Sequence, residues 1–154
     1  MSLKIVSRAF AQGKVIPDKY TCNGKNVSPP LQWTDVPRAA KELVLIVDDP
    51  DAPSGTFVHW LLYGLQPGES GVEEGIPAGT ATLPNGAHQG LNDFRKIGYA
   101  GPCPPSGTHR YYFHLYALDS ALNLPPGITR DKVDKAIKTH VVEEAELLGY
   151  YAKK

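Results

Sequence analysis

Two aspartates, two histidines and a tyrosine are the side chains of this sequence best suited to bind a ligand. Asp49 and Asp51 follow an apolar segment, His59 lies within the next one, and His109 and Tyr111 begin a third. A buried carboxylate needs N–H donors, a cation or an imidazole as its partner. Carboxylates that orient imidazoles, together with a tyrosine hydroxyl and loop N–H groups, would form a small polar pocket for a phosphate or carboxylate.

Each of these residues also has a structural explanation that the pattern leaves open. The two aspartates suit a proline-rich turn, where their side chains cap backbone groups. A histidine in an apolar strand is more often a satisfied core residue than a ligand, and a tyrosine near it suits an aromatic core. The binding hypothesis therefore depends on whether the fold brings the five residues together.

Two enzymatic hypotheses compete with anion binding. Cys103, with His59 or His109 as its base, would act as the nucleophile of a hydrolase, and the glycine-rich loop around it would supply oxyanion donors. Prolines on both sides of Cys103 argue against this hypothesis, because they favour a rigid loop over a helix N-terminus. The set Asp49, Asp51, His59 and His109 suits zinc by ligand type, but its spacing matches no compact zinc motif.

The composition and the missing motifs exclude several other classes. The 154 residues include sixteen basic and sixteen acidic groups, a formal net charge of +0, which argues against nucleic acid as a partner. No Gly-x-Ser-x-Gly elbow, Walker loop or dinucleotide fingerprint occurs. We therefore expect no cofactor and find no support for a serine hydrolase, a nucleotidase or a dehydrogenase.

The location of the protein is predicted from its apolar segments and its cysteines. The longest apolar run, 43–47, is far shorter than the roughly 20 residues that span a bilayer. Residues 1–8 lack the apolar stretch of a secretory signal, although a removed signal would leave no trace. Cys22 and Cys103 form no Cys-x-x-Cys motif, and two thiols alone favour free cysteines over a disulfide. We therefore expect a cytoplasmic protein that does not insert into membranes.

The pattern of residues predicts one domain, 1–154, built mainly of strands. The 15 glycines and 14 prolines favour strands and turns over a helical bundle. Apolar or alternating segments predict strands at 43–47, 57–63 and 109–118. The short spacing between the first two indicates antiparallel neighbours. Together they predict a mostly antiparallel sandwich.

The C-terminal segment is predicted to be a helix that packs against this sandwich. Thr129 suits the N-cap, and Gly149 would end the helix. The apolar stripe consists of Val133, Ile137, Val141, Ala145 and Leu148. Whether this helix or a strand edge supports a homodimer is left open.

Four segments in this order resemble the signature of the phosphatidylethanolamine-binding protein family, which includes the Raf kinase inhibitor proteins. They are Asp49-Pro50-Asp51-Ala52-Pro53, His59-Trp60, the loop 98–107 and His109-Arg110-Tyr111. Segments 20–31 and 89–94 resemble the shorter bacterial and archaeal branch of the family. The resemblance runs from residue 5 to residue 151.

The resemblance implies a Greek-key β-sandwich and a small anion pocket that accepts phosphate or phosphoryl head groups. The matching positions are Asp49, Asp51, His59, His109 and Tyr111, with backbone N–H groups from the loop around Gly101 and Cys103. A non-enzymatic role, inhibition of a kinase or protease partner and a cis peptide before Pro53 are also implied. Asn23, Ala100 and Arg95 depart from the usual Asp, Gly and Gly. Arg95 either alters the ligand charge preference or lies on the surface.

Overall fold

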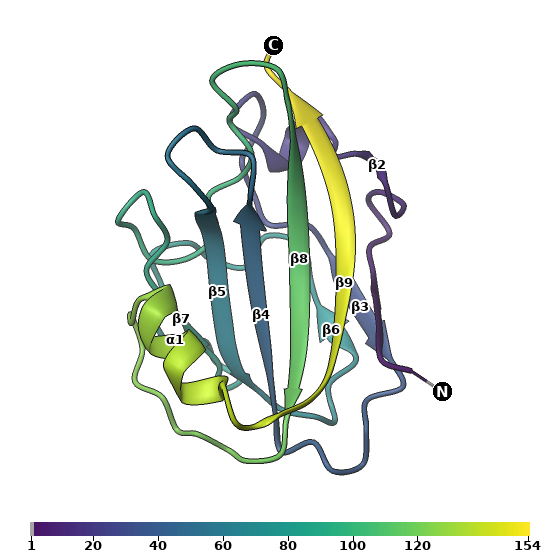
Figure 1. Ribbon diagram of the computed structural model, residues 1–154, viewed down its shortest axis with the longest axis vertical. Coiled ribbons are helices and arrows are strands. Elements are labelled where there is room, and N and C mark those ends of the chain that lie inside the picture. Colours follow the sequence, from purple (N-terminus) through teal and green to yellow (C-terminus); the bar gives the residue numbers. More distant parts are fainter. Residues whose placement is uncertain (1) are drawn as a thin grey trace.

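The computed structural model describes residues 2–154, which form two β-sheets, one α-helix and a short 3-10 helix (Figure 1). The elements are β1 (Lys4–Val6), β2 (Lys14–Val15), η1 (Asp18–Tyr20), β3 (Leu31–Thr34), β4 (Glu42–Asp49), β5 (Phe57–Leu65), β6 (Gly71–Val72), β7 (His88–Gln89), β8 (Thr108–Leu118), α1 (Arg130–Ile137) and β9 (Val141–Ala152). The sheet orders are β1-β3-β6 and β2-β9-β8-β4-β5-β7. Neighbouring strands are antiparallel except β2 and β9. The prediction of a mainly antiparallel β-sandwich is confirmed.

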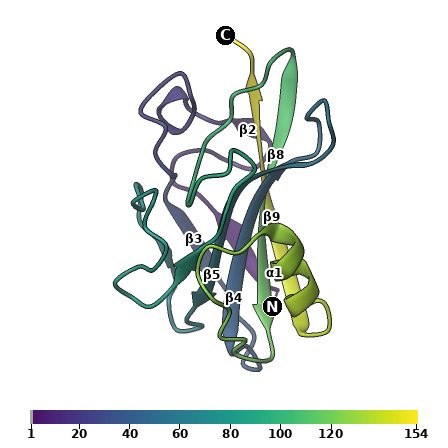
Figure 2. The same ribbon diagram turned by 90° about the vertical axis from the view of Figure 1, so that its left-hand side faces the viewer.

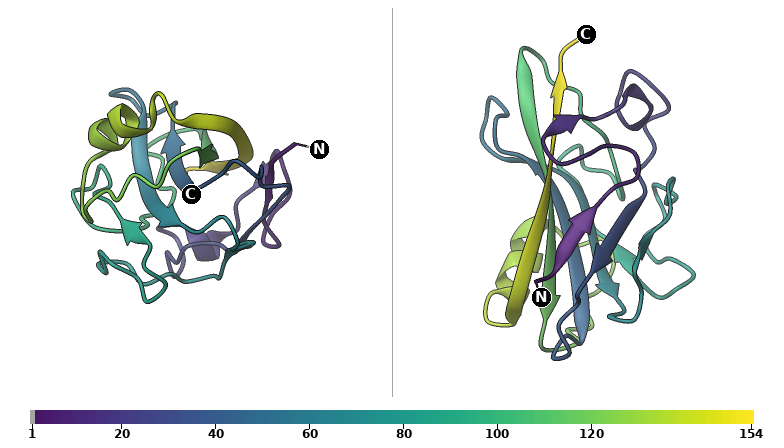
Figure 3. Two further views of the ribbon diagram at one scale, coloured as in Figure 1. Left: turned by 90° about the horizontal axis from the view of Figure 1, so that it is seen from below. Right: turned by 90° about the vertical axis from the view of Figure 1, so that its right-hand side faces the viewer.

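The two sheets pack face to face and enclose the main core (Figures 2 and 3). Successive side chains of a strand point to opposite faces of its sheet. In β8, Tyr111 and Phe113 are accordingly buried in this core, whereas Tyr112 and His114 lie half-buried on the other face. The alternation read from the sequence therefore places His109 and Tyr111 on the inner face of the large sheet.

Helix α1 covers part of the outer face of the large sheet (Figure 2). Its buried residues Val133 and Ile137 join a second apolar cluster with Val44 and Ile46 of β4. All eight residues of β4 are buried, because this strand has the core on one face and this cluster on the other. Within residues 2–154, no helix has the length and apolar character needed to cross a bilayer.

The predicted C-terminal helix is wrong beyond Ile137. Residues from Val141 onward form β9, which pairs with the whole length of β8. Side chains of a strand alternate between its two faces, so residues four positions apart lie on the same face. The apolar spacing of Val141 and Ala145 therefore fits a strand as well as a helix. Gly149 does not end a helix: a Cβ there would lie 2.6 Å from Cγ1 of Ile16, so glycine is needed for this side chain to pack.

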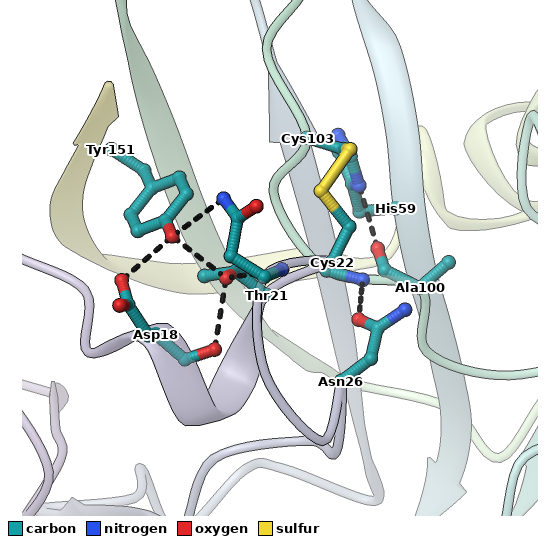
Figure 4. The surroundings of a disulfide bond; sticks show 10 residues. Asp18, Thr21, Cys22, Asn26, His59, Ala100, Cys103 and Tyr151 are labelled. Atoms are coloured by element: carbon teal, nitrogen blue, oxygen red, sulfur yellow. Dashed lines mark hydrogen bonds between the residues drawn. A yellow bond between two sulfur atoms is a disulfide. The ribbon is translucent and has the colours of Figure 1, made fainter. Parts of the chain in front are cut away.

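The expectation of free cysteines is also wrong, because Cys22 and Cys103 form a disulfide across 81 positions of the chain (Figure 4). The N–H of Cys22 donates to the Pro102 carbonyl at 3.1 Å, which holds the two loops together. Pairing requires Cα atoms within about 7 Å, and that proximity is set by the fold rather than by local sequence. The pairing also removes one argument for a reducing compartment, since disulfides persist mainly in oxidising ones.

The turn between β4 and β5 contains no cis peptide, so the prediction of a cis bond before Pro53 is wrong. Every peptide bond in residues 2–154 is trans. The chain reverses instead through a turn closed by the Gly55 N–H and the Ala52 carbonyl, 3.1 Å apart. Gly55 has φ +108°, a backbone conformation that favours glycine.

Candidate functional site

A cavity of about 390 Å³ lies where β4 ends and β5 and β8 begin. We call it the histidine pocket. Antiparallel pairing of β4 with both neighbours places these three strand ends side by side. It is lined by Asp49, Ala52, Pro53, Ser54, Gly55, Phe57, His59, Phe94, Cys103, Pro104, Pro105, His109 and Tyr111.

His109 and Asp49 form a buried pair in this pocket. Nδ1 of His109 lies 2.6 Å from Oδ2 of Asp49, and both side chains are almost completely buried. The other carboxylate oxygen of Asp49 accepts the Asp51 N–H at 2.8 Å. Asp49 therefore both caps the turn and orients an imidazole, and its role in ligand binding stays a prediction.

His59 is held by a backbone carbonyl rather than by a carboxylate (Figure 4). Its Nδ1 lies 2.6 Å from the Ala100 oxygen. Its ring packs against Phe57, Phe94 and Tyr111. Burial lowers the pKa of His59 below the ordinary value of 6.5 and outweighs the opposing effects of the Ala100 carbonyl and the Asp49 charge. This imidazole is therefore neutral at pH 7.

Tyr111 lies within reach of both imidazoles. Its ring centroid is 5.4 Å from that of His59, in an edge-to-face arrangement, and 6.4 Å from that of His109, in a stacked one. Burial raises the pKa of Tyr111, and the negative charge of Asp49 raises it further. The hydroxyl therefore remains protonated next to the Asp49 carboxylate.

Comparison with known proteins identifies the family to which this arrangement belongs. The sequence profile described as phosphatidylethanolamine-binding protein matches residues 6–152. The chain belongs to the phosphatidylethanolamine-binding protein family. The resemblance of its motifs and the fold expected from them are thereby confirmed.

Relatives of similar length occur in archaea and bacteria. A UPF0098 protein of Methanothermobacter thermautotrophicus is 50% identical over 99% of both chains. Another, from Pyrococcus abyssi, is 49% identical over 97% of this chain and 85% of its own. The crystal structure of a phosphatidylethanolamine-binding protein homolog, CT736 of Chlamydia trachomatis, matches with a TM-score of 0.90 and 44% identity over 99% of both chains. That of E. coli YBCL matches with a TM-score of 0.89 and 27% identity over the whole of both chains.

Asp51, the second acidic residue of the family motif, does not line the histidine pocket. Its carboxylate oxygens accept hydrogen bonds from the backbone N–H, Nε and NH2 of Arg110 at 2.8 to 2.9 Å. These bonds lower the pKa of Asp51 to about 2. The structure therefore places Asp51 between the turn and β8, where it is bonded to Arg110, and its predicted ligand contact stays a prediction.

The predicted N–H donor of Gly101 is already used within the protein. It donates to Oδ1 of Asn26 at 2.7 Å, and a Cβ at this position would collide with the Tyr20 carbonyl. Gly101 lines a neighbouring cavity instead, together with Asn26 and both cysteines. It therefore packs two loops together, and the expectation that it supplies an anion donor is wrong.

Neither enzymatic hypothesis is supported by this geometry. Cys103 lines the histidine pocket, but its sulfur is bonded to Cys22, so the thiolate that the hydrolase hypothesis requires is absent. In the part of the chain that the structure describes, no group of three or more His, Cys, Asp or Glu side chains is arranged to hold a metal ion. Asp51 is engaged by Arg110, and Asp49 by His109.

Sequence reasoning missed the apolar walls of the pocket. Phe57 packs edge-on against Phe94, with ring centroids 4.7 Å apart, and Phe94 is still 45% exposed. Phe94 belongs to the bacterial and archaeal motif 89–94, which was the available signal. Arg95 follows in an exposed turn with φ +62°, so of its two predicted roles the structure shows the surface position.

Proposed function

We propose that the histidine pocket reversibly binds phosphate or a small phosphorylated molecule without converting it. The observation that carries this proposal is the meeting of the buried Asp49–His109 pair with His59 in one cavity. Protonated His109 donates from Nε2 to an anionic oxygen, while Asp49 provides the countercharge. The Tyr111 hydroxyl is a second donor.

Binding of this kind is weak. A few charge-assisted hydrogen bonds of about 1.5–3 kcal/mol each must offset an association cost of about 4 kcal/mol or more. The Asp49 carboxylate next to His109 also limits the favourable charge available to an anion. We expect a millimolar Kd, equivalent to about −4 kcal/mol.

We further propose that occupancy of the pocket regulates a protein partner, with a kinase or a protease as the class that the family resemblance implies. The exposed Phe94 at the edge of the pocket supports this proposal, because exposed aromatic side chains are enriched at protein interfaces. A cytoplasmic location and the absence of nucleic-acid binding belong to the same proposal.

Calorimetric titration with inorganic phosphate and phosphoethanolamine tests the ligand. We expect saturable millimolar binding that His109→Ala abolishes while the fold is retained. His140→Ala is the matched control, because His140 also pairs with an aspartate, Asp119, at 2.8 Å but lies outside the histidine pocket. Equal loss in both variants, or no binding to the wild type, would contradict the proposal.

A further inference from the structure

The outer face of the large sheet is covered by α1 at one end only. In Figure 1 this face is toward the viewer, and no other element of residues 2–154 lies in front of β8 and β9 above α1. A groove of about 920 Å³ runs here from α1 across β4 and β8 to Glu146 of β9. A second cavity, of about 360 Å³, shares His114, Tyr116 and Glu146 with it. We call the two together the outer groove, which lies on the opposite face of the sheet from the histidine pocket because side chains alternate along β8.

A row of planar side chains on β8 forms the floor of the outer groove. Tyr112, His114 and Tyr116 occupy alternate positions, and their rings lie nearly parallel with centroids 5.6 and 6.1 Å apart. The guanidinium of Arg110 lies over Tyr112, 5.8 Å from the ring centroid. Within residues 2–154, no Lys or Arg lies over Tyr116 in this way. Tyr116 is only partly buried, so its ring can accept a cation from another molecule.

The side chains around this floor carry an excess of negative charge, although the whole chain has a formal net charge of +0. The two guanidiniums of the groove are already paired within the protein. Arg110 pairs with Asp51, and Arg130 is shared by two carboxylates that line the groove. Six carboxylates line the outer groove; they are Asp48, Asp93, Asp131, Asp134, Glu144 and Glu146.

Glu144 and Glu146 form a regularly spaced pair along one side of the groove. They lie opposite Tyr116 and His114 in the register of β8 and β9, so their side chains share the face of those rings. Both glutamates are exposed, and no Lys or Arg of the described residues pairs with either. Two residues of a strand span about 6.6–6.8 Å. The pair therefore matches two cations at alternate positions of an extended chain.

We propose that the outer groove binds an extended segment of a partner protein that carries arginines at alternate positions. Each guanidinium meets one glutamate of β9, and one of them also lies over the Tyr116 ring, as Arg110 lies over Tyr112. Tyrosine and arginine are the side chains most enriched at the centres of protein interfaces. The inference goes beyond the proposed function, because it concerns the other face of the sheet and does not depend on the histidine pocket.

The charge of the groove argues against the other occupants of such a face. A second copy of the chain in a two-fold dimer would place the same acidic surface on both sides of the interface. Like charges in contact across an interface oppose association. Nucleic acids and anionic membranes carry the same sign of charge as the groove. A basic protein segment is the occupant that complements it.

Calorimetric titration with the peptide Gly-Arg-Gly-Arg-Gly, blocked at both ends, tests the inference at pH 7.5 and low ionic strength. We expect one saturable site with a Kd of about 0.1–1 mM, which weakens as added salt screens the ion pairs. The isomer Gly-Arg-Arg-Gly-Gly should bind about threefold more weakly, because neighbouring side chains of an extended segment point in opposite directions. Equal binding of the two isomers would overturn the inference, since it would show attraction without register.

The double variant Glu144→Gln, Glu146→Gln keeps the shape of the groove and removes both charges, so the peptide should bind about tenfold more weakly. Glu69→Gln, Glu73→Gln is the matched control, because these residues precede and follow β6 of the small sheet and lie outside the outer groove. The control should bind within about twofold of the wild type. Equal loss in both double variants, or no saturable binding to the wild type, would overturn the inference.

Two further measurements locate the peptide and test the role of the ring. Amide shifts on binding should be concentrated in residues 112–116 and 144–146, and shifts confined to the histidine pocket would overturn the inference. A lysine version of the peptide should bind the wild type about threefold more weakly than the arginine peptide, and Tyr116→Leu should remove this preference. If the wild type sediments as a dimer that Glu144→Gln, Glu146→Gln converts to a monomer, a second copy covers the groove and the inference fails.

Discussion

Asp49 and His109 are separated by 60 positions in the chain, and their side chains meet at 2.6 Å in the interior. Asp49 ends β4, and His109 lies one residue inside β8. Strand pairing brings these ends together, and the His109 imidazole binds one oxygen of the Asp49 carboxylate while the Asp51 N–H binds the other. A change to either residue is therefore expected to alter both the free energy of unfolding and ligand binding in the pocket.

Removal of the Asp49 carboxylate is expected to affect both properties. Asp49→Asn removes the countercharge of His109, so phosphate affinity should fall about tenfold or more. The buried pair is also disrupted, which should lower the free energy of unfolding by about 1–3 kcal/mol. Calorimetry and urea denaturation measure the two effects. In Asp119→Asn, which removes the exposed carboxylate next to His140, neither quantity should change appreciably.

Asp51→Asn tests whether Asp51 only holds Arg110 in place or also contacts phosphate. Because Asp51 faces Arg110 outside the pocket, we expect the phosphate Kd to stay within about twofold of the wild-type value, a difference of about 0.4 kcal/mol. A loss as large as that of Asp49→Asn, measured in the same titration, would mean that Asp51 contacts the ligand.

The buried neutral His59 predicts that the fold loses stability in acid. Its folded pKa lies below 6.5, so the unfolded chain binds a proton that the folded protein does not. The contribution is therefore fully present above about pH 6.5 and is lost as the pH falls below that value. Denaturant unfolding at pH 7.5 and pH 5 should show a smaller loss in His59→Phe than in the wild type. Identical losses would show that His59 is not the group responsible.

The disulfide is expected to be a main source of stability. Closing a loop of 81 residues restricts the unfolded chain, so the Cys22→Ser, Cys103→Ser double variant should lose about 2–4 kcal/mol. Because Cys103 lines the histidine pocket, phosphate should also bind more weakly. Urea midpoints and thiol quantification check both points. Two reactive thiols in the unreduced native protein would contradict the structure.

Gly149→Ala tests the close packing of β9 against the segment that contains Phe10 and Ile16. In β9 the added methyl would press on Ile16 and Phe10, so we expect a loss of about 1–3 kcal/mol. Gly68→Ala, at a site with no heavy atom within 4 Å, should be nearly neutral. A Gly149→Ala variant as stable as the wild type would contradict the close packing of Gly149 against Ile16 and Phe10.

The central strands and the pocket histidines could be predicted from local patterns. The run 43–47 is apolar at every position because β4 is buried on both faces. Segment 109–118 alternates because β8 is buried more deeply on one face than on the other. Both patterns can be read directly from the sequence. The meeting of Asp49, His59 and His109 came from the family motifs, because strand order is not encoded in local periodicity. The structure confirms that they share a cavity.

The remaining features depend on contacts between distant segments. Val141 and Ala145 fit a helix or a strand equally well, and only pairing with β8 decides between them. The disulfide depends on the approach of two loops. The use of the Gly101 N–H depends on Asn26, 75 positions earlier in the chain. In each case tertiary structure determined the outcome, and no nearby residue indicated it.

Amide chemical-shift mapping with inorganic phosphate at pH 6 tests the central claim most directly. We predict saturable shifts concentrated at Asp49, His59 and His109, and their disappearance in His109→Ala but not in His140→Ala. Shifts scattered over other surfaces, or no saturable change at tens of millimolar phosphate, would contradict the assignment of this pocket as an anion site.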